Sequence, residues 1–153
     1  MEDSLNFLIM SYVRILVHTV WTTKNRLPYL NDKIRDDVIH HIRQNAVEKK
    51  IFIDNINGEK EHIHALISMS KNQNIAEIMQ YIKGESSFWI NRQRITTGKF
   101  EWQDDYYGVS IGITQLEVLR EYIRNQVIHH RKTSFEDELD ILIREYGLER
   151  KWD

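Results

Sequence analysis

Two histidines separated by a single isoleucine stand near the middle of the chain, in the stretch EHIHALI at positions 61–67. Alternate residues of a β-strand share a face, so His62 and His64 would project together while Ile63 packs beneath them. Two neighbouring imidazoles form half of a binding site for a divalent metal ion. The alternative is structural, because a histidine pair on the exposed face of a half-buried strand needs no ligand.

A second stretch, EYIRNQ at positions 121–126, supplies residue types that complement the histidine pair. In a helix Tyr122 and Gln126 share a face, one turn apart, at the border of the apolar stripe. A tyrosine hydroxyl, with a pKa of about 10, is a poor nucleophile unless a cation polarises the phosphate it attacks. Two imidazoles and the glutamine carbonyl oxygen could hold that cation beside the tyrosine. Alternatively, Tyr122 covers the edge of the core and Gln126 is solvated.

The hydrophobic pattern predicts the elements that position these residues. Apolar, β-branched stretches predict four strands, at about 11–20, at 51–56, around the histidine pair and at 109–113. Apolar residues at helical spacing predict helices from 32 to about 49, from about 74, from 114 and from about 134. The order β-α-β-β-α-β followed by two helices predicts an α+β, ferredoxin-like fold: one antiparallel sheet with helices on one face, plus C-terminal helices. We expect residues 1–153 to form a single domain.

Local signals predict where these elements begin and end. Asn57-Gly58 is typical of a hairpin turn, and Gly84 is expected to interrupt the helix that begins near Asn74. Thr114 and Glu117 fit a capping box, which predicts a helix start at Thr114. The polar turn KNR at positions 24–26 follows a strand end, so it is either a solvated loop or a phosphate contact.

Composition narrows the classes of protein that fit. The chain has no cysteine, which excludes disulfides and cysteine-ligated zinc, and no apolar run long enough to span a membrane. We therefore expect a cytoplasmic protein with no membrane partner. The net charge of −2 argues mildly against nucleic acid, but residues 136–153 hold seven acids and three bases. The other 135 residues therefore carry a charge of +2, which leaves room for a local basic surface.

Six stretches together resemble the single-tyrosine HUH transposases of small bacterial insertion sequences, which include the REP-associated tyrosine transposases. His62-Ile63-His64 is similar to the histidine–hydrophobe–histidine motif, and residues 122–126 are similar to the tyrosine helix. The other similar stretches are the opening strand and basic turn (17–26), a lysine-glycine-serine helix segment (82–87), a tryptophan-glutamine turn (100–103) and the run QVIHHR (126–131) followed by Phe135.

The resemblance implies a role for each site residue. It implies that Tyr122 is the nucleophile, that His62, His64 and Gln126 are metal ligands, and that the cofactor is a divalent ion, Mg²⁺ or else Mn²⁺. The reaction would give a 5′-phosphotyrosine and a free 3′-hydroxyl on single-stranded or hairpin DNA. Candidate DNA contacts are Lys24, Arg26, Lys83 and Arg131. Glu61 stands where the family commonly has aspartate.

The resemblance also implies a homodimer in which the tyrosine helix of one subunit can complete the other's site. The short link from the last strand to that helix, residues 112–114, favours the same arrangement because it limits the helix's reach. Two rival functions share the fold. One is a replication or relaxase-type nickase, which the short chain disfavours; the other is a hairpin-binding or domesticated module that does not transpose, which the intact Tyr122, His62, His64 and Gln126 disfavour.

Overall fold

The computed structural model describes residues 11–127 and 133–146. The elements run in the order β1 (Ile15–Thr22), η1 (Lys24–Arg26), α2 (Asp32–Glu48), β2 (Phe52–Gly58), β3 (His62–Met69), α3 (Ile75–Arg92), β4 (Tyr107–Ile111), η2 (Ile113–Gln115), α4 (Leu116–Arg124) and α6 (Phe135–Tyr146). The predicted order of strands and helices is therefore confirmed. Among these elements no helix is long and apolar enough to cross a membrane.

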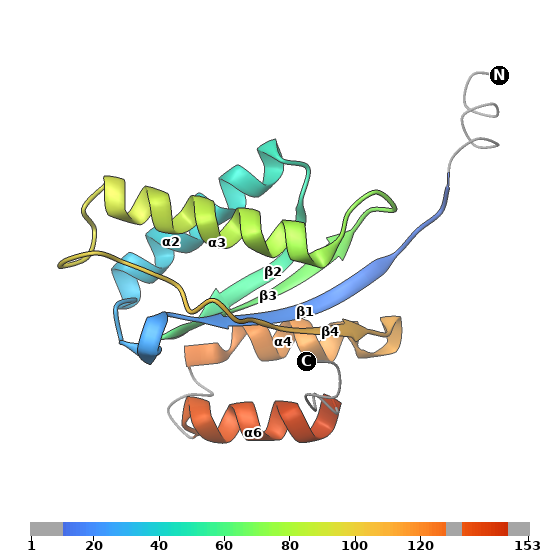
Figure 1. Ribbon diagram of the computed structural model, residues 1–153. Coiled ribbons are helices and arrows are strands. Elements are labelled where there is room, and N and C mark those ends of the chain that lie inside the picture. Colours follow the sequence, from blue (N-terminus) through green and yellow to red (C-terminus); the bar gives the residue numbers. More distant parts are fainter. Residues whose placement is uncertain (1–10, 128–132, 147–153) are drawn as a thin grey trace.

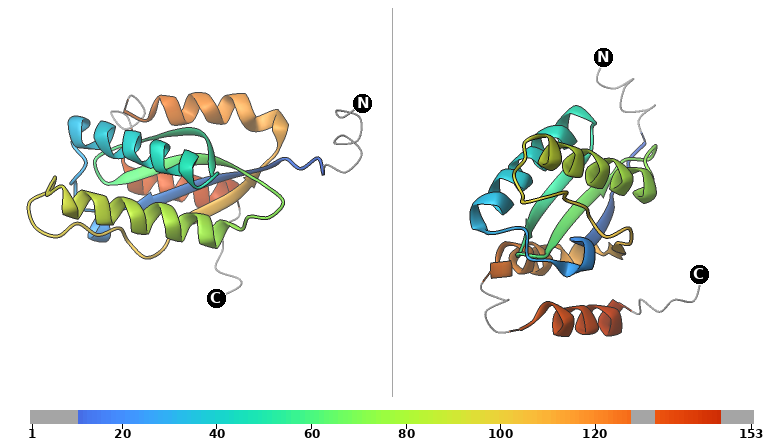
Figure 2. Two further views of the ribbon diagram at one scale, coloured as in Figure 1. Left: turned by 90° about the horizontal axis from the view of Figure 1, so that it is seen from above. Right: turned by 60° about the vertical axis from the view of Figure 1, so that its left-hand side comes forward.

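The four strands form one antiparallel sheet in the order β2-β3-β1-β4, as the ferredoxin-like prediction requires. Helices α2 and α3 cover one face, as expected for the two helices inside the β-α-β-β-α-β unit (Figure 1). Helices α4 and α6 lie on the opposite face, and the two further views in Figure 2 show the same three-layer arrangement. The sequence pattern had left the position of these C-terminal helices open.

Strand β3 lies inside the sheet, between β2 and β1, and its successive side chains point to opposite faces of the sheet. Ile63, Ala65 and Ile67 belong to the main core beneath α2 and α3. Leu66 faces the other way and packs with Leu119 and Ile123 of α4. Because His62 and His64 have the parity of Leu66, they too point toward the α4 and α6 side.

Several predicted boundaries differ from the structure. Helix α3 continues through Gly84 without a break, because its buried stripe, Ile82, Ser86 and Ile90, runs on past the glycine. One glycine costs a helix only about 1 kcal/mol, which this packing outweighs. Strand β2 includes Asn57-Gly58, so the hairpin turn comes after it, at residues 59–61. Strand β4 begins and ends two residues earlier than predicted.

Helix α4 starts at Leu116, two residues later than the predicted capping box, because a short 3-10 turn precedes it. An ion pair fixes the helix to the sheet: Arg120 donates hydrogen bonds of 2.8 Å and 2.6 Å to the two carboxylate oxygens of Asp54 on β2. The Arg120 guanidinium holds the pKa of Asp54 below its ordinary value of 3.8. This contact sets the position of the helix that carries Tyr122.

Candidate metal and tyrosine site

His62 and His64 lie at the start of β3, opposite Thr22 and Val20 of the neighbouring strand β1. Both side chains are completely buried, so the interpretation of an exposed histidine pair on a strand is wrong. Their ring centroids are 5.0 Å apart, which confirms the shared face that the alternation predicted. Buried polar groups require partners, and the partners of these two rings define the site.

The Nδ1 atom of each ring has its own partner away from the centre of the site. Nδ1 of His62 is 2.8 Å from the Glu61 carboxylate, and Nδ1 of His64 is 2.9 Å from Nε2 of His18 on β1. Burial, with His64 as the second cause, lowers the pKa of His18 to about 3, so that ring is neutral near pH 7. In the tautomer with the proton of each ring on Nδ1, these contacts are donated outward and both Nε2 lone pairs face the interior of the site.

Helix α4 brings Tyr122 to this pair, and Gln126 follows just beyond the end of the helix. The side-chain oxygen of Gln126 is 3.1 Å from Nε2 of His62, and the Tyr122 ring is 5.6 Å from that of His64. Gln126 is completely buried, so the interpretation of a solvated glutamine is wrong. The structure thus joins the two stretches that sequence reasoning had connected.

Glu138 on α6 completes the group, and sequence reasoning missed it. Its carboxylate accepts a hydrogen bond from the Tyr122 hydroxyl and lies 3.0 Å from Nε2 of His64. Its side chain is 2% exposed. A signal was present in the sequence: Glu138 lies three residues after Phe135 and four before Leu142, inside the apolar stripe of its helix. A carboxylate in such a stripe must find a polar partner in the interior.

Helix α6 covers the site. Phe135 stacks on His62 with ring centroids 4.1 Å apart, and Phe135, Leu139 and Leu142 form a small apolar cluster with Val20 of β1. The site is therefore enclosed between the sheet, α4 and α6. Polar groups in this low-dielectric enclosure interact more strongly than they would in water.

The donor atoms fit a divalent metal ion. One ligand atom from each of His62, His64 and Glu138 lies within 4.8 Å of the others, and the Gln126 oxygen adjoins His62. Within the site the Glu138 carboxylate accepts hydrogen bonds from the Tyr122 hydroxyl and from the Gln126 amide nitrogen. Two imidazole nitrogens, a carboxylate and an amide oxygen are ligands that first-row divalent ions accept.

The candidate DNA contacts lie beside this site rather than in it. Arg26 has its guanidinium 5.4 Å from the Phe135 ring and 3.4 Å from the Glu136 carboxylate, so it adjoins the α6 cover. Lys24 pairs with Glu101 at 3.0 Å, and Lys83 donates a 2.6 Å hydrogen bond to the backbone oxygen of Asp104. Burial lowers the pKa of the Lys83 ammonium group. Arg131 lies outside the described residues.

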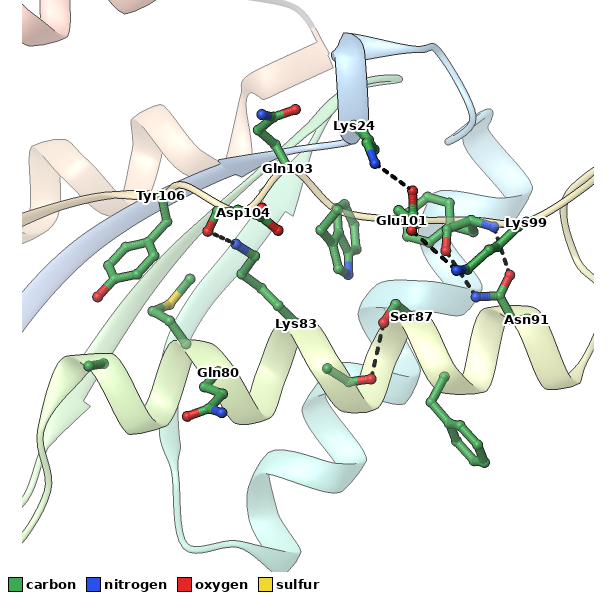
Figure 3. Close-up of a pocket in the computed structure, with 16 residues that line it drawn as sticks. Lys24, Gln80, Lys83, Ser87, Asn91, Lys99, Glu101, Gln103, Asp104 and Tyr106 are labelled. Atoms are coloured by element: carbon green, nitrogen blue, oxygen red, sulfur yellow. Dashed lines mark hydrogen bonds and ion pairs between the residues drawn. The ribbon is translucent and has the colours of Figure 1, made fainter.

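Lys24 and Lys83 both line a groove of about 620 Å³ between α3 and the segment 99–106. In Figure 3 each lysine reaches across toward that segment, Lys24 from the η1 turn and Lys83 from α3. The groove lies at the end of the sheet where Thr23 forms a β-bridge with Trp102. Thr23 directly follows Thr22, which pairs with His62 on β3.

Tyr122 meets the histidines of its own chain, which differs from the shared site that the short 112–114 link had favoured. Helix α4 turns back under the sheet and packs against β2 and β3, so the short link does not keep it from the start of β3. One described chain therefore contains the tyrosine, both histidines, the glutamine and the glutamate.

Comparison with the sequences and structures of known proteins adds evidence that is independent of the site geometry. Residues 11–126 match the family described as "Transposase IS200 like". No curated protein matches the chain significantly. A structure from Deinococcus radiodurans R1 described as a transposase matches with a TM-score of 0.61 and 20% identity, over 76% of this chain and 95% of that one. A REP-associated tyrosine transposase bound to a REP hairpin also matches with a TM-score of 0.61, at 14% identity, over 79% of this chain and 72% of that one.

At these identities the two structures support the fold, whereas the family match concerns the sequence itself. It runs from the start of the described chain through the tyrosine helix. It therefore includes His62, His64, Tyr122 and Gln126 but stops before Glu138. With three quarters of its length matched and the site residues inside the match, the chain belongs to the IS200-like transposase family.

Proposed function

We propose that this transposase is metal-dependent and acts on single-stranded DNA, cleaving and rejoining it through a 5′-phosphotyrosine intermediate. One observation carries the proposal: buried lone-pair atoms converge beside a tyrosine hydroxyl, and they belong to His62, His64, Gln126 and Glu138. Burying four polar side chains together costs desolvation free energy, which favours a functional role for the group.

Each side chain has a task in the proposed reaction. Tyr122 attacks the phosphorus, and the bond from phosphorus to the 3′-oxygen breaks. Glu138, which already accepts the hydrogen bond of the Tyr122 hydroxyl, takes its proton, and the departing oxygen gains a proton to become a 3′-hydroxyl. In the reverse direction a 3′-hydroxyl attacks the tyrosyl ester. One ester replaces another at each step, so no external energy source is needed.

The proposed cofactor is a divalent ion, Mg²⁺ or else Mn²⁺, held by the two Nε2 atoms with Gln126 and Glu138. The bound ion supplies positive charge that polarises the phosphate and stabilises the charge that develops on it. The outward contacts of the rings, to Glu61 and His18, support this assignment because they hold both imidazoles in one tautomer and one orientation.

The proposed partner is single-stranded or hairpin DNA, contacted by Lys24, Arg26, Lys83 and, outside the described residues, Arg131. The REP-associated relative, which is bound to a hairpin, supports this substrate class. We also propose a homodimer, in which the basic region at η1 would occur twice. Doubling the basic surface would strengthen attraction to phosphate in a chain whose net charge is −2.

A second candidate function is DNA hairpin binding without strand cleavage, as in a domesticated copy. The enclosure of the site favours it, because Phe135 and Glu138 of α6 lie directly on the histidines and tyrosine.

One experiment separates the two functions. Purified protein is mixed with labelled single-stranded oligonucleotides from the DNA on both sides of its gene, in Mg²⁺, Mn²⁺ or excess chelator. We expect a covalent protein–DNA adduct on a denaturing gel with either metal, no adduct with chelator, and none for Tyr122→Phe. Tight DNA binding without an adduct in either metal would instead favour the non-cleaving function.

A further inference from the structure

The groove between α3 and segment 99–106 has features that the fold itself does not require. It is open, about 620 Å³ in volume, and lined by three lysines, Lys24, Lys83 and Lys99, and two acids, Glu101 and Asp104. Glu101 forms ion pairs with Lys24 and Lys99. Aromatic side chains also line it, and among them Tyr106 is half-buried, with the Lys83 ammonium group 5.8 Å from its ring centroid. Grooves that combine lysines with accessible aromatic rings are surfaces that single-stranded nucleic acids occupy.

Gly84 gives an independent indication of a ligand. It lies in the middle of α3 and lines the groove, where a glycine lowers helix stability relative to alanine. Packing does not explain it, because a β-carbon built at this position meets no described atom within 4 Å. A missing side chain on a groove wall lets another molecule approach the helix backbone closely.

The η1 turn lies between the groove and the tyrosine site, at the end of the sheet. Lys24 lines the groove, and two residues later Arg26 lies over Phe135, whose ring stacks on His62. The turn is held in place although Asn25 and Arg26 have φ angles of 57° and 54°. The Asn25 backbone N–H donates to the side chain of Gln103, and that of Arg26 donates to the Thr23 carbonyl. Strained backbone conformations that surrounding hydrogen bonds hold in place are a feature of turns that contact ligands.

We propose that this groove binds unpaired nucleotides of the DNA strand that is cleaved at Tyr122. The strand leaves the tyrosine site, passes Arg26 and Lys24, and enters the groove. Its backbone runs over Gly84 beside Lys83, and one base stacks on Tyr106. The inference rests on the proposed function, because it assumes a DNA strand at Tyr122. It assigns the unpaired part of the substrate, rather than the hairpin stem, to this surface.

The test compares two labelled DNA probes by fluorescence anisotropy: a blunt hairpin from the flanking DNA, and the same hairpin with its natural single-stranded extensions. The full chain is measured as wild type, Gly84→Ala, Tyr106→Leu and Lys33→Ala. Lys33→Ala is the charge control, since Lys33 is exposed on α2 and does not line the groove. Thermal unfolding is recorded for each variant.

We expect wild type and Lys33→Ala to bind the extended probe more tightly than the blunt one. Gly84→Ala and Tyr106→Leu should each weaken binding of the extended probe by about tenfold, the scale of one lost stacking or backbone contact, and leave the blunt probe unaffected. Gly84→Ala should also raise the Tm by about 2–4 °C, because alanine favours the helix. A more stable protein that binds less DNA cannot be explained by misfolding.

Three results would overturn the inference, and they separate it from the proposed function. If Gly84→Ala and Tyr106→Leu bind the extended probe like wild type, the groove is not the strand site, although the transposase function stands. If they weaken both probes equally, the groove contacts the stem instead. If wild type binds neither probe, the proposed DNA substrate fails and the groove assignment fails with it.

Discussion

Glu138 of α6 accepts a hydrogen bond from the hydroxyl of Tyr122 on α4, sixteen residues earlier in the chain. The same carboxylate lies 3.0 Å from Nε2 of His64 and 3.7 Å from Nε2 of His62. One acidic group therefore contacts both the proposed nucleophile and the proposed metal ligands. Glu138 lies on the C-terminal helix, beyond the family match, which ends at residue 126.

Replacing Glu138 tests whether its charge serves the metal. Glu138→Gln keeps the shape of the side chain but removes its charge, so we expect Mn²⁺ affinity to fall by at least about tenfold. Because a bound ligand stabilises the native state, the rise in Tm that Mn²⁺ produces should shrink correspondingly. Glu145→Gln, an exposed position on the same helix, is the control. An unchanged Mn²⁺-induced rise in Tm would remove Glu138 from the metal site.

Tyr122→Phe tests the nucleophile. The substitution removes only the hydroxyl, and the ring still packs beside His64. We expect no covalent adduct with DNA and an affinity for DNA close to that of wild type. Tyr106→Phe and Tyr107→Phe, which change the two tyrosines near the start of β4, should still form the adduct. An adduct with Tyr122→Phe would show that a different residue attacks the phosphate.

Replacing Glu61 tests whether its carboxylate orients the His62 ring. Its carboxylate is the partner of His62 Nδ1 at 2.8 Å, so Glu61→Ala should weaken metal binding by about 10–100-fold, the usual effect of losing an outer partner of a ligating histidine. Glu61→Asp keeps the carboxylate and should bind metal nearly as well as wild type. Calorimetric titration with Mn²⁺ after chelator treatment measures both, with Glu59→Ala as the control. Equal affinities for Glu61→Ala and wild type would contradict the assigned tautomer.

Replacing Asp54 tests whether its ion pair with Arg120 anchors α4, the helix that carries Tyr122, to the sheet. Asp54→Asn should lower the free energy of unfolding at pH 7 by about 1–2 kcal/mol, since it removes a partly buried, two-pronged ion pair. The pKa of Asp54 is depressed in the folded state, so its contribution is present above the ordinary value of 3.8 and is lost as pH falls below it. The difference between variant and wild type in urea unfolding should therefore be full at pH 7 and shrink only as pH falls below about 3.8.

Glu117→Gln is the matched control for that measurement, because Glu117 also pairs with Arg120 but is 76% exposed. We expect it to change stability by less than about 0.5 kcal/mol. A loss as large as that of Asp54→Asn would mean that the anchor is the surface pair and not the contact with β2.

The parts of the site that sequence predicted are those set by local periodicity. His62 and His64 share a face because β3 is a strand. Tyr122 lies about one turn before Gln126 because it is on the last turn of α4, and Gln126 follows just after the helix ends. The missed contributions of His18 and Glu138 depend on tertiary docking. His18 reaches His64 through the pairing of β1 with β3, and Glu138 reaches Tyr122 only because α6 packs under the sheet. The hydrophobic pattern of one helix or strand does not indicate which other helix or strand packs against it.

The prediction that sites are shared between subunits rested on the short link between β4 and α4. A link of a few residues between β4 and α4 looked too short for the helix to reach its own histidines. That estimate ignored direction: α4 runs back beneath β2 and β3, with Arg120 held by Asp54, and this carries Tyr122 to the start of β3. The length of the link limits where the helix begins, but the direction of the helix axis decides where its other end lies.

Mixing two inactive variants tests whether the site is built within one chain. Tyr122→Phe lacks the nucleophile and His64→Ala lacks a metal ligand. In the structure Tyr122 and His64 of one chain are adjacent, so neither variant holds a complete site and we expect the mixture to form no DNA adduct. A homodimer that exchanged tyrosine helices would instead combine the intact Tyr122 of one subunit with the intact His64 of the other. Adduct formation by the mixture, after unfolding and refolding the two variants together, would therefore show that the active enzyme shares its sites. Sedimentation of the same sample establishes whether mixed dimers are present, and wild-type protein treated identically shows that refolding restores activity.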